Sequence, residues 1–399
     1  MATIFQNVLT ATFLFLLIIL MILCGICFIK IMLYTFRALL GKTSIKFTQN
    51  IPTDLYRISM LFLMLICLLI ISQHSVKTPE ITGENAISEL RKIELNGRTQ
   101  WISIRGQNKE APVLLFLAGG PGGTQLAAVR HTLSTLEKHF IVIGWDQPGS
   151  GKSYESGNSL SPEDYIKDGE ALTHYLIEEF NQNKITLVGE SWGSYLGLKL
   201  VEKSPDIYER LITTGQMVDF LETELIDYAK TIELSFKSGD FKTMNKLITN
   251  GKPPYYGKNV TAKTALYINY LTNEMNRNLA IHNPGYDTMR DLMSPEYSIL
   301  DKINFFRGIL YTFNDVYQQL YDIDLRENVT KIEVPIMMII GRHDLNAPTA
   351  LAEEYYNLLD APQKKWIWFE HSGHSPWINE SNLFIEEVID FTSSFQLDL

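Results

Sequence analysis

The sequence predicts an α/β fold: a mostly parallel sheet with helices on both faces, a helical cap insertion and an N-terminal transmembrane region. Three observations predict this. From residue 112 onward, short apolar runs alternate with helical patterns; one long helical stretch interrupts the alternation; and two strongly apolar runs occupy the first 75 residues. Near-continuous apolar strands separated by helices are typical of parallel sheets that are covered on both faces.

Composition narrows the possible functions. The chain has 399 residues, 46% of them hydrophobic and 20% charged, which is typical of a globular protein. Its net charge of -10 and the lack of any block of lysines and arginines exclude nucleic acid as a partner. Cys24, Cys27 and Cys67 all lie in very apolar segments. Cys24 and Cys27 have the spacing of a redox or metal pair, but no partner histidine or cysteine stands near them, so we interpret the cysteines as small apolar residues of a membrane span. No metal or organic cofactor is implied.

Residues 1–75 are predicted to form a membrane anchor with helices at about 8–29 and 57–72. The run Val8–Ile29 carries no charge and is long enough to cross about 30 Å of hydrocarbon as a helix. No basic residue precedes it and no small-residue cleavage site follows, so it differs from a secretory signal. The second run, Ile58–Ser72, is at the lower limit for a span, and lying in the membrane interface is its alternative.

The loop between the two runs indicates the orientation. Against one acid, Asp54, the basic residues there are Lys30, Arg37, Lys42, Lys46 and Arg57. The positive-inside rule places this loop in the cytoplasm. We therefore expect a multi-pass protein of the cell membrane whose remaining chain is extracytoplasmic. If the second run is only interfacial, the remaining chain lies inside instead.

The segments 76–216 and 326–399 are predicted to form the α/β core. "KIELNGRTQWISIRG" (92–106) alternates in polarity on either side of Asn96-Gly97, which indicates a β-hairpin. The buried-strand runs are 112–117, 140–145, 184–189, 210–215, 334–341 and 364–370. Residues 217–325 show helical spacing with no comparable strand run, so we expect a helical cap there.

The segment "KITLVGESWGSYLG" (184–197) places Ser191 between a strand and a helix, inside a Gly-x-Ser-x-Gly pattern. Such a nucleophile elbow turns so sharply that tiny residues must flank the serine, while its Oγ projects above the sheet. A plain glycine-rich turn is the alternative for this pattern alone. The position between strand and helix favours a nucleophile.

A serine nucleophile needs a base, and the base needs an acid to hold its tautomer. Asp344 follows the strand run 334–341, and His374 stands in a glycine-containing loop after the run 364–370. The chain order Ser, Asp, His and the location at carboxyl ends of strands agree with a hydrolase triad.

Other residues compete for the same roles. His343 and His371 are alternative bases, but each sits close to its strand end, where a structural role is expected. Asp360 lies in a helix-to-strand loop and is a poor acid for the triad. A metal cluster of the three nearby histidines is disfavoured because the triad explains His374 better.

Acyl transfer also needs donors for the developing oxyanion. "LAGGPGG" (117–123) follows a predicted strand and supplies a glycine turn. We predict the backbone N–H groups of Gly120 and of Trp192, which directly follows the nucleophile, as the oxyanion hole.

Five motifs together resemble a known family. They are "GGPGG" (119–123), "WDQPGSGKS" (145–153), "GESWGS" (189–194), "GRHD" (341–344) and "SGH" (372–374). The chain from about residue 90 to 399 is similar to the proline iminopeptidase-type serine aminopeptidases of the α/β-hydrolase superfamily. The resemblance implies the same triad, the same oxyanion hole and a substrate-binding cap. Two positions depart from the family: Ala118 replaces its usual histidine, and Pro148 replaces the arginine of its Asp-Gln-Arg-Gly motif.

The expected function is a membrane-anchored serine hydrolase, an aminopeptidase acting on short peptides. An esterase or lipase with the same triad is one alternative, and a non-catalytic receptor is another. The partners are a small peptide or ester substrate and the lipid bilayer; the oligomeric state stays open.

An aminopeptidase must bind an α-ammonium group, which calls for carboxylates in the cap. The candidate acids are Glu222, Glu224, Glu233 and Glu274, and the candidate pocket aromatics are Tyr255, Tyr256, Phe305 and Phe306. Solvated helix faces and ordinary packing are the alternatives for these residues.

Overall fold

The computed structural model describes residues 2–41, 51–155, 159–283 and 285–393. The chain divides into two compact units. One unit combines Met1–Lys77 with Met293–Lys302, and the other combines Thr78–Leu292 with Ile303–Leu399.

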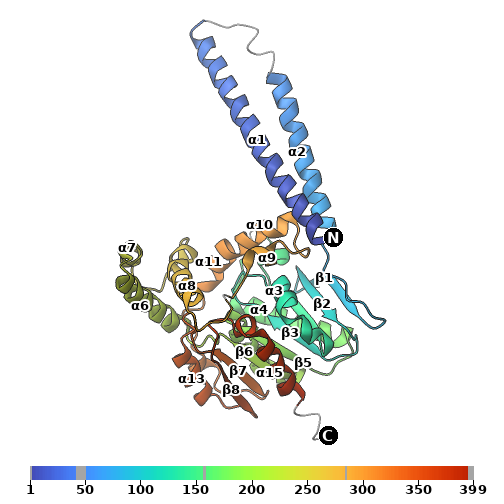
Figure 1. Cartoon of the computed structure of the whole chain (residues 1–399), viewed down its shortest axis with the longest axis vertical. Helices are drawn as coiled ribbons and strands as arrows, with labels where there is room; N and C mark the ends of the chain where they lie inside the picture. Colours follow the sequence, from blue (N-terminus) through green and yellow to red (C-terminus); the bar gives the residue numbers. More distant parts are fainter. Residues whose placement is uncertain (1, 42–50, 156–158, 284, 394–399) are drawn as a thin grey trace. The chain divides into compact units, whose positions relative to one another are not determined.

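An eight-stranded sheet forms the centre of the larger unit, in the order β1-β2-β4-β3-β5-β6-β7-β8 (Figure 1). The strands are β1 Ile87–Leu95, β2 Arg98–Gly106, β3 Val113–Leu117, β4 Ile141–Asp146, β5 Ile185–Glu190, β6 Tyr208–Thr214, β7 Ile336–Gly341 and β8 Lys364–Phe369. The pairs β1–β2 and β2–β4 are antiparallel, and all the others are parallel. The predicted strands and the mostly parallel sheet are therefore confirmed.

The hairpin between β1 and β2 turns at Asn96-Gly97, as predicted. Both residues have positive φ, 49° and 78°, and Leu95 pairs directly with Arg98. Asparagine and glycine tolerate this left-handed conformation, which a two-residue hairpin turn requires.

Helices cover both faces of the sheet because its strands are apolar on both sides. Leu114 and Phe116 of β3 face a core built with α3, α14 and α15, whereas Val113 and Leu115 face a core built with α4, α5 and α13. The helices and short helical turns of this core are α3 Leu126–Leu133, η2 Ser134–Lys138, η3 Gly151–Ser153, α4 Pro162–Glu179, α5 Trp192–Lys203, η4 Pro205–Ile207, α13 Thr349–Leu358, α14 Pro376–Asn379 and α15 Ser381–Ser393.

A helical insertion follows β6 and precedes β7, as the sequence predicts. Its helices are α6 Phe220–Ser238, α7 Phe241–Asn250, α8 Val260–Arg277, α9 Thr288–Leu292, α10 Ile299–Arg307, the π-helical η5 Gly308–Thr312, α11 Phe313–Tyr317 and α12 Leu325–Asn328. No strand lies between β6 and β7 in the described residues of this stretch.

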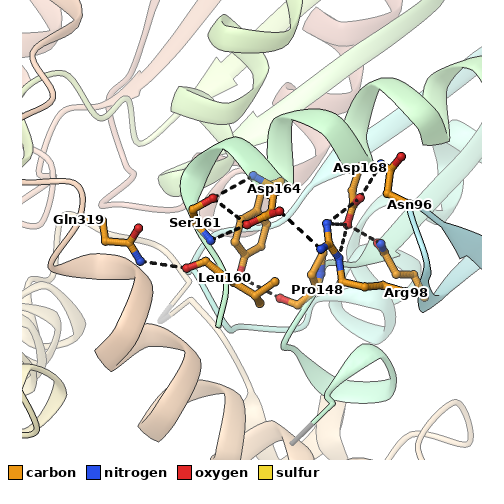
Figure 2. Close-up of polar contacts among 10 residues, drawn as sticks. Asn96, Arg98, Pro148, Leu160, Ser161, Asp164, Asp168 and Gln319 are labelled. Carbon is orange, nitrogen blue, oxygen red and sulfur yellow. Dashed lines mark hydrogen bonds and ion pairs between the residues drawn. The ribbon is translucent and has the colours of Figure 1, made fainter. Parts of the chain in front are cut away.

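A buried ion pair attaches the hairpin to α4 (Figure 2). Arg98 places two guanidinium nitrogens 3.0 and 3.1 Å from the fully buried carboxylate of Asp168, and Asn96 donates to the same carboxylate at 2.7 Å. One turn earlier, Ser161 caps α4 by a reciprocal capping box with Asp164. The edge hairpin and the start of α4 are thus fixed to one another by charge-assisted hydrogen bonds.

The smaller unit contains α1 Ala2–Leu39 and α2 Ile51–His74, both longer than the predicted spans (Figure 1). Each is long and apolar enough to cross a membrane, and only 11% of its most apolar window is buried. The basic residues Lys42 and Lys46 of the connecting loop lie outside the described residues.

Residues 293–302, which the sequence assigns to the cap, pack in this smaller unit against the helix ends. Ile299 joins an apolar cluster with Leu9, Phe13 and Leu65. The Ile299 N–H also donates to Ser72 Oγ at 2.9 Å. This association could not be predicted from the sequence, because the two segments are more than 200 positions apart.

Candidate active site

Ser191 stands at the junction of β5 and α5 in a conformation that side chains rarely adopt. Its φ and ψ are 53° and -119°. Its N–H donates to the Thr214 carbonyl of the neighbouring strand at 2.9 Å, which holds the turn in place. Backbone strain of about 1–3 kcal/mol persists only where the surroundings enforce it, and it is concentrated at functional sites.

The two glycines around Ser191 are required by close approach of the backbone. A Cβ on Gly189 would lie 2.3 Å from the Gly193 carbonyl oxygen, and one on Gly193 would lie 2.1 Å from the Leu117 carbonyl oxygen. Both distances are far below van der Waals contact. The sequence argument for tiny flanking residues therefore has a direct geometric cause.

Gly193→Ala is expected to lower the free energy of unfolding by at least about 2 kcal/mol, because the new methyl group collides with backbone rather than with a movable side chain. Chemical denaturation of the variant measures the change. Gly169→Ala in α4 is the matched control: its methyl group would meet only Leu200 side-chain atoms, at 3.0 Å. Equal stability of the two variants would contradict the steric explanation.

His374 and Asp344 lie side by side in the loops that follow β8 and β7. His374 Nδ1 is 2.9 Å from Asp344 Oδ2 and 3.1 Å from Oδ1. The same carboxylate accepts the backbone N–H groups of Asn346 and Ala347, at 2.8 and 2.9 Å, which fix its orientation. Burial by itself lowers the pKa of His374, but the charge of Asp344, its hydrogen bond and the charge of Glu190 together raise that pKa above its usual value.

A cavity of about 190 Å³ brings the predicted residues together. It is lined by Gly120, Ser191, Trp192, Met217, Phe220, Glu224, Asp227, Ile268, Phe313, Tyr317, Asn346 and His374. Four of the five predicted site residues, Gly120, Ser191, Trp192 and His374, are in this lining. The fifth, Asp344, is outside the lining and contacts His374. No lysine or arginine lines the cavity in the part of the chain that the structure describes.

The competing residues lie elsewhere. His371 stacks on His282 with ring centroids 3.8 Å apart and is exposed. The His343 N–H donates to the Ser372 carbonyl, and the Asp360 side chain is 72% exposed. None of the three competing residues lines the cavity.

Trp192 opens α5, so its N–H is among those that a helix leaves without an internal partner. Its buried indole donates to Gln147 Oε1 at 2.9 Å, and Gln147 Nε2 donates to the Ala118 carbonyl at 3.1 Å. Gln147 therefore connects the nucleophile turn with the turn that carries Gly120. Within the motif "WDQPG", Gln147 is the residue that makes this connection to the candidate active site. The carbonyl of Pro148 accepts a hydrogen bond from the Tyr165 hydroxyl at 2.9 Å.

Two cap carboxylates, Glu224 and Asp227, enter the cavity from α6, and both are buried. Burial raises the pKa of Glu224 to about 8, although hydrogen bonds from Tyr317 and Thr264 lower it. Burial, with the nearby charges of Glu224 and Asp344, raises the pKa of Asp227 well above its usual value. The two groups therefore lack a compensating positive charge in this state.

Asp227 lines the cavity but was not predicted from the sequence, and three of the four candidate acids lie outside the lining, in the ion pairs that the alternative of solvated helix faces predicts. Glu222 pairs with Arg326, Glu233 with Lys230 and Lys237, and Glu274 with Arg277. The named aromatics Tyr255, Tyr256, Phe305 and Phe306 are also absent from the cavity lining. The spacing of Glu224 and Asp227, one helical turn apart, was the available signal, because it places both carboxylates on one face.

The chain is similar in sequence to known hydrolases. The family model for the alpha/beta hydrolase fold matches residues 112–381. The chain is 31% identical over 313 residues to "Probable aminopeptidase YbaC" of Bacillus subtilis, covering 76% of this chain and 96% of that protein. It is 25% identical over 303 residues to "Proline iminopeptidase" of Saccharolobus solfataricus, covering 72% and 86%.

Among solved structures, that of proline iminopeptidase from Mycobacterium smegmatis superposes with a TM-score of 0.56. The identity is 16%, and the match covers 77% of this chain and 99% of that one, so this likeness concerns the fold. The fold predicted from the sequence is thereby confirmed, and the chain belongs to the α/β-hydrolase fold family.

Proposed function

We propose that this protein is a membrane-anchored serine aminopeptidase that releases N-terminal residues from short peptides. Ser191 Oγ attacks the scissile carbonyl carbon while His374 takes its proton. The imidazolium then gives that proton to the departing amine, and water hydrolyses the acyl-enzyme by the same route. Asp344 holds the imidazole in the required tautomer, and the N–H groups of Gly120 and Trp192 stabilise the oxyanion.

The observation that carries the choice of substrate is a group of unsatisfied acceptors in the cavity. Asp227 Oδ1 and Asn346 Oδ1 are buried without a hydrogen-bond partner among the described residues, and Glu224 lies beside them in the lining. An α-ammonium group offers three N–H donors and one positive charge. It would satisfy acceptors whose burial is otherwise costly, and it would favour their ionised forms.

The relatives support the same choice. Two proteins that cover more than two thirds of the chain are named as an aminopeptidase and a proline iminopeptidase. The proposal does not extend to a preference for an N-terminal proline, because Ala118 and Pro148 depart from the motifs of the proline iminopeptidases.

A substrate panel tests the proposal on the purified full-length protein. Short peptides with a free N-terminus, their acetylated forms and short-chain esters are compared by kcat/KM. Acetylation is expected to reduce kcat/KM at least about tenfold, because it removes one charge contact of roughly 1.4 kcal/mol. Equal rates on free and acetylated peptides, or faster cleavage of esters, would assign the protein as an esterase instead.

We further propose that α1 and α2 span the cell membrane. A polar contact between α1 and α2 lies at each end of the apolar part of the two helices. Gln6 hydrogen-bonds to Ser72 at one end, and Lys30 Nζ lies 2.5 Å from Asp54 at the other. In α1, Gln6 and Lys30 are separated by about 36 Å at about 1.5 Å per residue, close to the thickness of a bilayer's hydrocarbon core. The large apolar side chains between these levels are mostly exposed, which favours contact with lipid.

The basic loop between the helices supports a cytoplasmic loop and an extracytoplasmic hydrolase unit. Protease added to spheroplasts is therefore expected to digest the chain beyond residue 77 and to leave a membrane-bound fragment. Lysed spheroplasts and a cytoplasmic marker protein serve as controls. Full protection before lysis followed by digestion after it would reverse the orientation.

A further inference from the structure

Glu190, the residue before Ser191, is a buried carboxylate that the proposed mechanism does not use. Its side chain is almost completely buried, with 1% of the residue exposed. It is not among the residues that line the cavity. Burying a carboxylate costs free energy of folding unless hydrogen-bond donors satisfy it. A buried carboxylate directly beside the candidate nucleophile is therefore a candidate for a role at this site.

Three side chains from separate segments donate to this carboxylate. Ser375 Oγ donates to Oε1 at 2.6 Å, and Gln125 Nε2 donates to Oε2 at 2.5 Å. The Tyr286 hydroxyl also donates to Oε2. Burial and the charge of Glu190 raise the pKa of the Tyr286 phenol well above its usual value, so it remains a donor at neutral pH.

Each donor belongs to a segment that the site depends on. Ser375 directly follows His374, the candidate base. Gln125 also accepts the Gly119 N–H at 3.2 Å and so holds the turn next to Gly120. Tyr286 comes from the insertion and packs edge-on against Trp377, with centroids 5.7 Å apart.

We propose that Glu190 is a positioning residue: its carboxylate joins the base loop, the oxyanion turn and a cap segment to the nucleophile turn. This inference rests on the proposed hydrolase mechanism. Misplacing reacting groups by about 1 Å can cost roughly 100-fold in rate, so one carboxylate with three anchors is well placed to set this geometry.

Glu190 also acts on the base through its charge. The titratable groups around His374 are Asp344 from the loop after β7, Glu190 from β5, and Glu224 and Asp227 from α6. Because Glu190 favours the imidazolium, removing its charge lowers the pKa of His374. A purely structural contact would not produce that change.

Glu190→Gln tests the inference, because it keeps the side-chain size and removes the charge. It also replaces one acceptor oxygen by an amide NH₂ group, which cannot accept a hydrogen bond from Ser375, Gln125 or Tyr286. We expect kcat to fall about 10- to 100-fold with KM little changed. Because the pKa of His374 is lowered, the acidic limb of the pH profile of kcat/KM should move to lower pH. Glu370→Gln, which removes the same charge from the exposed partner of Arg342, is the control and should leave kcat and the pH profile unchanged.

Two further measurements keep the inference separate from the proposed function. Ser375→Ala and Tyr286→Phe each remove one anchor, and either should lower kcat even if Glu190→Gln does not fold. NMR titration of ¹³C-labelled histidines follows His374 whether or not the protein turns over a substrate. An inactive wild-type enzyme would refute the proposed function. The role of Glu190 would be overturned by an unchanged kcat in the two anchor variants together with an unchanged His374 titration in folded Glu190→Gln.

Discussion

Ser191→Ala is expected to lower kcat for the best substrate by roughly 10³-fold or more while the protein stays folded. The hydroxyl is the only group in the proposed mechanism that forms the covalent acyl intermediate, so no neighbouring side chain replaces it. His374→Ala should cause a loss of similar size, because the alcohol is a poor nucleophile without its base. Steady-state kinetics on membranes or purified protein measure both losses.

Covalent labelling provides an independent measurement of the same prediction. A fluorophosphonate probe should label Ser191 in the wild type and should leave the Ser191→Ala variant unlabelled. Ser194→Ala is a useful comparison, because its hydroxyl donates to the Ser191 carbonyl at 2.6 Å and takes no part in the chemistry. Near wild-type turnover by the Ser191→Ala protein would contradict the assignment of Ser191 as the nucleophile of the triad.

The double variant Glu224→Gln/Asp227→Asn is expected to lower kcat/KM for peptides with a free N-terminus by about tenfold or more. Both substitutions keep side-chain size and remove the buried negative charges that would meet the ammonium group. The acetylated peptide should be affected much less, so the ratio of the two kcat/KM values should approach one. This ratio is the decisive quantity, because a general loss of structure would reduce both rates together.

Glu222→Gln is the matched control on the same helix. Glu222 pairs with Arg326 at 2.6 Å and does not line the cavity, so this variant should keep the wild-type ratio. A double variant that still discriminates against acetylation as strongly as the wild type would show that the amine is bound elsewhere. The proposed aminopeptidase would then need another set of acceptors.

The sequence by itself determined the features that depend on local chemistry. Glycines at 189 and 193 were predicted from the sharpness of one turn, and the turn residues Asn96 and Gly97 from the conformation of a hairpin. The strands were predicted from short apolar runs, and parallel strands bring their carboxyl ends to one edge of the sheet. For that reason Ser191 and His374, predicted from separate strand ends, line one cavity in the structure.

Tertiary structure alone decided which polar side chains meet. Of the four cap acids named from the sequence, only Glu224 enters the cavity, because helical spacing alone does not say which faces of α6 and α8 are turned inward. The contacts of Glu190 join segments between 65 and 185 positions away, and the packing of residues 293–302 against α1 and α2 spans still greater separations. Periodicity and turn residues report a chain's local conformation, whereas contacts between distant segments depend on the order of the strands and the packing of the cap.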